Sequence, residues 1–251
     1  MKKIFSILAI MIVASTTMFA ADNNKIVDKK IEVTNFERLV NKGSTRVEYR
    51  QGDVASVTVH GLAQNVDKII VEQTGKTLTI SQKGAINNYV GFSGLLKAIK
   101  DGAENGVIVV YVTSPDLTAV TLDGSGDIAA KGKVDTDKLE ITLKGSGDID
   151  FDDIICDQMN ASLMGSGDIE IDRLESITSD IKLRGSGDVK VRQHNVRRTD
   201  LEIIGSGDIS VNGTKCGEVK ASVIGSGDIT LSGEFKNIEK NIKGSGDINV
   251  R

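Results

Sequence analysis

The stretch GSGDI at residues 124–128 occurs six more times, as GSGDI or GSGDV, before the chain ends. The first glycines of successive copies are separated by 21, 20, 20, 20, 20 and 19 residues. These glycines are Gly124, Gly145, Gly165, Gly185, Gly205, Gly225 and Gly244. A nearly constant period of this size is typical of stacked repeat proteins, in which one unit cannot bury its apolar face alone. The repeat therefore predicts a solenoid.

The residues around each motif alternate between apolar and polar side chains. Around Gly145, for example, Ile141, Leu143, Ile149 and Phe151 all stand at even distances from the glycine. Alternate residues of a strand point to opposite faces, so this pattern predicts strands with one buried face. Both glycines of GSGD then point inward, where they let two strands meet at a narrow corner and permit the angles of a bend.

Stacking such units places equivalent strands side by side and parallel, about 4.8 Å apart. Crossovers between parallel strands are overwhelmingly right-handed. The sequence therefore predicts an all-β fold, a right-handed parallel β-helix with coils of about 20 residues and seven GSGD corners.

The chain is expected to have three parts. Residues 1–20, with Lys2, Lys3 and an apolar run that follows them, are typical of a secretory signal peptide. Residues 21–123 are interpreted as an N-terminal β-rich part of the solenoid, and residues 124–251 as the GSGD-repeat β-helix. A separate N-terminal subdomain is the alternative for the middle part.

An insertion is expected near the N-terminal end of the solenoid, at about residues 84–106, where the alternation stops. Leu95, Leu96 and Ile99 are spaced for a short amphipathic helix that ends at Gly102. We expect this loop or short helix to cover one end of the coil, because solenoids need end caps.

Charge and hydropathy exclude some partners. Without Lys2 and Lys3 the chain has 29 basic residues, from a total of 31, and 35 acidic residues, a net charge of −6. This mildly acidic mixture does not favour nucleic acid as a partner. After the signal peptide no segment reaches the ~18 apolar residues that span a bilayer. We therefore expect an exported chain without a transmembrane segment, in the periplasm or at the cell surface.

The two cysteines are predicted to be free thiols. Cys156 and Cys216 each lie eleven residues after the first glycine of a motif, three coils apart. Three coils correspond to about 14 Å along the axis, whereas a disulfide requires α-carbons within about 7 Å. Val196 stands at the same offset between them, which favours a buried apolar column.

The aspartates of the motifs form the first candidate site, an outward column of carboxylates about 4.8 Å apart. Like charges at this spacing repel each other unless they are neutralised. Three explanations are considered: hydrogen bonds from loop N–H groups, bridging cations, or an external partner. The first, a structural corner, is favoured, because the calcium-binding nonapeptide pattern is absent; no metal and no cofactor are expected. The column consists of Asp127, Asp148, Asp168, Asp188, Asp208, Asp228 and Asp247.

The second candidate is a local break in the repeat, VRQHNVRR, with Arg192, His194, Arg197 and Arg198. These side chains suit an anionic glycan or a phosphate, although a solvated connection, with Arg192 between Asp172 and Asn212, is the favoured interpretation. The GSGD serines lack the GxSxG form of a nucleophile elbow. No catalytic residue is assigned.

Several segments, in order, resemble one known family. DVASVTVHG, GKTLTISQKG and VYVTSPDLTAVTLDGSGDI, followed by coils such as LKGSGDI, are similar to the putative auto-transporter adhesin head, or head GIN, domain family. The resemblance implies a right-handed β-helix in the envelope of a Gram-negative bacterium and an adhesin role. We therefore expect a non-enzymatic protein that binds a glycan or a surface protein, or associates with itself. The alternative is a carbohydrate-active β-helix enzyme, a polysaccharide lyase or hydrolase.

Overall fold

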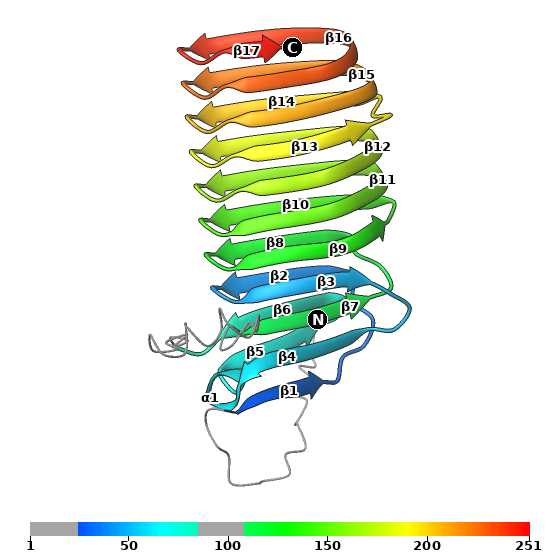
Figure 1. Cartoon of the computed structure of the whole chain (residues 1–251), viewed down its shortest axis with the longest axis vertical. Coiled ribbons are helices and arrows are strands. Elements are labelled where there is room, and N and C mark those ends of the chain that lie inside the picture. Colours follow the sequence, from blue (N-terminus) through cyan, green and yellow to red (C-terminus); the bar gives the residue numbers. More distant parts are fainter. Residues whose placement is uncertain (1–24, 85–107) are drawn as a thin grey trace, which may run out of the picture.

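The computed structural model describes residues 25–84 and 108–251, so the expected signal peptide and the helix expected around Leu95 lie outside the described residues. From Ala119 onward the chain winds upward in stacked coils (Figure 1). Equivalent strands of neighbouring coils pair in parallel, and the first glycines lie in one register from coil to coil. This confirms the predicted parallel β-helix. The strands are β8 (Ala119–Gly124), β9 (Asp127–Asp135), β10 (Lys138–Gly145), β11 (Asp148–Gly165), β12 (Ile169–Gly185), β13 (Val189–His194), β14 (Arg198–Gly205), β15 (Ile209–Gly225), β16 (Ile229–Gly244) and β17 (Ile248–Val250).

The interior is filled by the predicted aliphatic columns. Leu143, Leu163 and Leu183 lie in register on successive coils and are fully buried, as is Ile149 beyond the corner. At the C-terminal coil the same columns become accessible, and Val250 is 46% exposed. Side-chain burial therefore runs continuously along the axis, and the last coil leaves an end face open among the described residues.

The interior also contains a buried polar cluster. The Gln193 amide donates to Ser179 Oγ at 3.1 Å and accepts from Thr199 Oγ1 at 2.9 Å. All three side chains are at most 2% exposed. Because each polar group is paired, the cluster avoids the cost of an unsatisfied buried donor or acceptor.

The GSGD corners need glycine for a reason that alternation alone does not give. A Cβ added to Gly165 would lie 2.0 Å from Gly145 O, and one added to Gly167 would lie 1.9 Å from Gly147 O. The obstacle is thus the backbone of the preceding coil, not a narrow interior. The first glycines also adopt φ values between +131° and +148°, a region that side chains disfavour.

The N-terminal end departs from the expected uniform winding. Strands β2 and β3 form a coil between β6–β7 on one side and β8–β9 on the other, all paired in parallel. Beyond it, β4 pairs antiparallel with β7 and with β1, and β5 pairs antiparallel with β6. These outer strands and α1 close this end (Figure 1). The elements are β1 (Ile26–Ile31), β2 (Arg38–Gly43), β3 (Arg46–Gln51), β4 (Ser56–Leu62), α1 (Ala63–Val66), β5 (Ile69–Thr74), β6 (Thr77–Gln82) and β7 (Val109–Ser114).

The turn between β2 and β3 is a corner of the same type, which the GSGD motif does not predict. Gly43 pairs with Gly124 and Arg46 pairs with Asp127, so the sequence GSTR stands where later coils have GSGD. The side chain of Gln82 contacts this corner and accepts hydrogen bonds from the hydroxyls of Ser44 and Thr45. The Thr45 side chain is accommodated here by its contact with Gln82.

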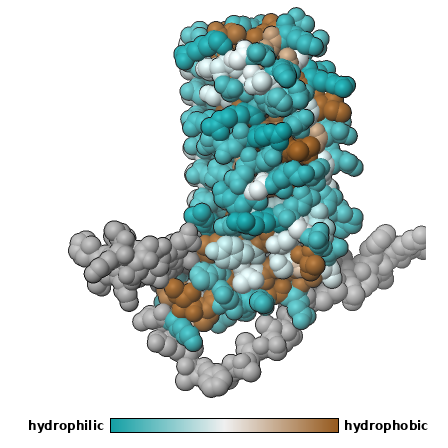
Figure 2. All heavy atoms as spheres, turned by 45° about the vertical axis from the view of Figure 1, so that its right-hand side comes forward, coloured by the Kyte–Doolittle hydropathy of each residue, from teal (hydrophilic) through white to brown (hydrophobic). Residues whose placement is uncertain are grey.

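Two further features bear on the sequence expectations. Cys156 and Cys216 are free and buried, as predicted. Among residues 25–84 and 108–251, no helix is both long and apolar enough to span a bilayer. The face seen in Figure 2 is mostly hydrophilic along the coils, with larger hydrophobic areas toward the N-terminal end.

Candidate functional site

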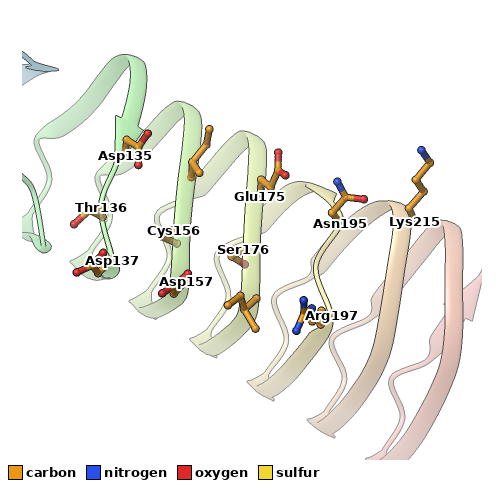
Figure 3. A pocket seen from close by; sticks show the side chains of 12 residues that line it. Asp135, Thr136, Asp137, Cys156, Asp157, Glu175, Ser176, Asn195, Arg197 and Lys215 are labelled. Atoms are coloured by element: carbon orange, nitrogen blue, oxygen red, sulfur yellow. The ribbon is translucent and has the colours of Figure 1, made fainter.

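A groove runs along the solenoid axis over the bends that lie half a coil away from the GSGD corners (Figure 3). Its volume is about 530 Å³. It is lined by Asp135, Thr136, Asp137, Ile155, Cys156, Asp157, Glu175, Ser176, Ile177, Asn195, Arg197 and Lys215. These residues come from five successive coils, so the parallel stacking itself assembles the groove.

The lining residues form rows because each coil contributes equivalent positions. Thr136, Cys156 and Ser176 make the floor, and Cys156 pairs in register with Ser176. One wall consists of Asp137, Asp157 and Arg197 in Figure 3, together with Ile177, whose carbonyl accepts the Arg197 N–H. The other consists of Asp135, Glu175, Asn195 and Lys215, together with Ile155, which is in register with Asp135 and Glu175. Backbone hydrogen bonds join neighbouring members of the first wall, from Asp157 N to Asp137 O at 3.0 Å and from Arg197 N to Ile177 O at 3.1 Å.

The two ends of the groove carry opposite unpaired charges. Within the described parts of the chain, the carboxylates of Asp137 and Asp157 form no ion pair, and neither do the cationic groups of Arg197 and Lys215. The two other acidic residues of the groove are neutralised locally, Asp135 by Lys133 at 2.8 Å and Glu175 by Arg173 at 2.7 Å. The groove is therefore anionic toward the N-terminal coils and cationic toward the C-terminal coils.

The Cys156 thiol at the floor is held in its neutral form. Burial, with a smaller contribution from the charge of Asp157, raises its pKa to about 11. Because the thiolate is the reactive species, this thiol is a packing group rather than a nucleophile at neutral pH. Burial likewise raises the pKa of the Cys216 thiol.

The four basic residues predicted from VRQHNVRR are not brought together. Arg192 binds Asp172 on the preceding coil and lies beside Asn212 of the next, as the favoured interpretation expected. Arg198 makes two hydrogen bonds to Asp200, at 2.9 and 3.2 Å, which raise its pKa.

The chain turns between these two arginines. Asn195 has φ of 59°, and only Arg197 of the four residues lines the groove. His194 ends β13, in register with Glu175. The predicted surface is thus divided among different sides of the solenoid.

The aspartate column has its own hydrogen-bonding partners. Five of its carboxylates accept the backbone N–H of the equivalent aspartate one coil on, at 2.8 to 3.2 Å. These acceptors are Asp148, Asp168, Asp188, Asp208 and Asp228. These carboxylates therefore have hydrogen-bonding partners within the corners, which supports the structural explanation of the column. The described residues contain no group of three or more His, Cys, Asp or Glu placed to hold a metal ion.

Grouping residues along the chain does not predict the groove. It places Arg197 with Arg192 and Arg198, whereas the neighbours of Arg197 in space are Ile177 and Asp157, one and two coils away. The signal is visible when the coils are written one below another: the position twelve or thirteen residues after each first glycine changes from acidic to apolar to basic.

Several solved structures share this fold. A putative adhesin from Bacteroides fragilis is 23% identical with a TM-score of 0.76, over 90% of this chain and 97% of that one. A putative adhesin from Parabacteroides distasonis is 20% identical with a TM-score of 0.72, over 91% and 98%. A protein from the same species described as a putative lipid binding protein is 23% identical with a TM-score of 0.69, over 91% and 98%.

At this identity the likeness establishes the fold alone. A search of curated proteins finds no match. The family described as putative auto-transporter adhesin, head GIN domain, matches residues 35–234 and 174–251, which together cover nearly all of the described solenoid. The chain belongs to this family.

Proposed function

We propose that this chain is an exported, non-enzymatic binding protein of a Gram-negative envelope, and that the groove is its contact surface for a glycan or a surface protein. The observation that carries the proposal is the set of unpaired charges in the groove. Elsewhere on the solenoid, several charges are neutralised between coils, as in Arg173 with Asp153 and Lys131 with Asp152. Unpaired charges of both signs, gathered in one groove, are available to a partner.

The family supports the proposal at a coarse level. Its description as an adhesin head domain implies contact with an external surface, and export follows from that role. The signal peptide expected in residues 1–20 agrees with export. The proposed location is the periplasm or the cell surface.

One observation favours the enzyme alternative. Asp137 and Asp157 lie on adjacent coils, about 5 Å apart if they follow the coil spacing, which is close to the separation of the two carboxyls in retaining glycosidases. However, both side chains are exposed. A general acid of such enzymes has its pKa raised by an apolar, enclosed setting. Binding without cleavage is therefore the better-supported function.

A glycan array combined with a turnover assay on pectic and host polysaccharides separates the two. We expect retention on immobilised glycans or surface proteins without product, weakened by Arg197→Ala and by Asp157→Asn. Arg198→Ala, which lies outside the groove, is the matched control. Release of oligosaccharides that is lost in Asp157→Asn, Arg192→Ala or His194→Ala would establish the enzyme instead.

A further inference from the structure

We infer that the groove receives an extended polypeptide segment that carries a basic residue at one end and an acidic residue about three or four positions away. The inference rests on the proposed function, because it specifies the ligand of the same groove. The ligand is thus a segment of a protein, and binding of a polysaccharide instead is one of the results that the experiments below can give.

The spacing of the charges along the axis supports this ligand. Arg197 lies two coils from Asp157 and three coils from Asp137 on the same wall. At about 4.8 Å per coil these separations are about 10 and 14 Å. An extended chain advances about 3.3 Å per residue, so three or four residues bridge the two ends. Basic and acidic side chains at that interval would each meet an opposite charge.

The middle of the groove suits the residues between these charges. Ile177 is 43% exposed on one wall, and Ile155 stands on the other side of the floor. They offer apolar surface to short side chains. Asn195 lies between Glu175 and Lys215 on the second wall, where its amide can donate to a carbonyl and accept from an N–H of a bound backbone (Figure 3).

Other ligand classes use the groove less completely. An anionic polysaccharide would meet Arg197 and Lys215 but would be repelled by Asp137 and Asp157. A neutral glycan would bury or crowd both sets of charges without neutralising them, which costs free energy. A polypeptide supplies both signs on one flexible chain, and its direction in the groove is fixed by which end is basic.

Four blocked peptides of equal length test the charge pattern, measured by fluorescence anisotropy at low and high salt. The first has a block of lysines, a glycine–serine spacer and a block of glutamates. The second has the same composition with lysine and glutamate alternating, and the other two carry lysines alone or glutamates alone. We expect the block peptide to bind most tightly and its affinity to fall with added salt, because exposed charge pairs are screened.

Charge reversal at each end tests the location. In a variant with Arg197→Glu and Lys215→Glu, the preferred ligand should become the lysine peptide. In a variant with Asp137→Lys and Asp157→Lys, it should become the glutamate peptide. Loss of one exposed pair should weaken binding of the block peptide up to about fivefold. Arg198→Glu makes the same charge change one residue outside the groove and should leave binding unchanged, and equal urea midpoints show that each variant folds.

Equal affinity for the block and alternating peptides, or equal effects of Arg197→Glu and Arg198→Glu, would overturn the inference. Loss of glycan retention in the groove variants, without binding of any peptide, would replace the polypeptide by a polysaccharide and leave the proposed function standing. If the groove variants keep the peptide preference of the wild type and are still retained on immobilised glycans or surface proteins, the groove is not the binding site.

Discussion

A methyl group at the second glycine of one corner should damage the stack far more than its size suggests. In Gly167→Ala the new Cβ would stand 1.9 Å from Gly147 O, whereas real Cβ contacts stay beyond about 3.0 Å. Two coils must then separate locally by about 1.1 Å, the difference between these values. That movement would stretch the bonds from Gly167 N to Gly145 O, at 3.3 Å, and from Asp168 N to Asp148 Oδ1, at 3.1 Å.

Loss of two such hydrogen bonds costs about 1 kcal/mol each, and overpacking adds about 1–3 kcal/mol. We therefore expect Gly167→Ala to lower the free energy of unfolding by about 3–5 kcal/mol. Gly132→Ala is the matched control, because Gly132 has φ of +79° with nothing within 4 Å of its Cβ position. It should cost only the left-handed backbone, about 1–2 kcal/mol.

Urea denaturation followed by circular dichroism measures both variants. Because stacked repeats lose cooperativity locally, the onset of unfolding should be compared as well as the midpoint. Ser166→Ala, an exposed neighbour, should change stability by less than about 0.5 kcal/mol. If Gly167→Ala proves no worse than Gly132→Ala, the close approach of coil backbones is not what requires glycine.

Three further expectations concern the aspartates, the buried polar cluster and the thiols. Asp188→Ala removes the acceptor of the Asp208 N–H and should lower the free energy of unfolding by about 1–2 kcal/mol. A chelator should leave the unfolding midpoint of the wild type unchanged. A midpoint that falls with chelator would favour cations that bridge the carboxylates. Gln193→Ala leaves the Thr199 hydroxyl without its acceptor in the interior and should cost about 1–3 kcal/mol by urea titration; no effect would mean that the cluster is not stabilising. Because the folded pKa of Cys156 is about 11, above its unfolded value, its stabilising contribution is complete below about pH 9 and is lost as pH rises through 11. The fall in stability at alkaline pH should be smaller in Cys156→Ala. A pH profile identical to that of the wild type would contradict the raised pKa of Cys156.

The sequence was sufficient to predict the coils from residue 124 onward, because each coil repeats alternate apolar residues and a glycine corner. Alternation placed Leu143 and Ile149 inside, and the offset of Cys156 and Cys216 correctly predicted separate thiols. The N-terminal end was harder, since the chain order there is not the order of the coils: β2 and β3 stack directly on β8 and β9, which come about 80 residues later.

The first corner shows why the motif could not reveal that arrangement. Thr45 stands where later corners have glycine, and its hydroxyl donates to the Gln82 side chain. The groove was also hidden, because Asp157 and Arg197 are forty residues apart and reach the same groove only through stacking on the one coil between them. Repeats make such sites predictable only when equivalent positions are compared across coils.

The claim that the groove, rather than the aspartate column, receives the partner is tested most directly by amide hydrogen exchange on the full chain with saturating block peptide. The account predicts slower exchange in the segments around Asp157, Ile177 and Arg197, with the GSGD corners unchanged. Protection confined to the corners, or no protection in any segment, would contradict it.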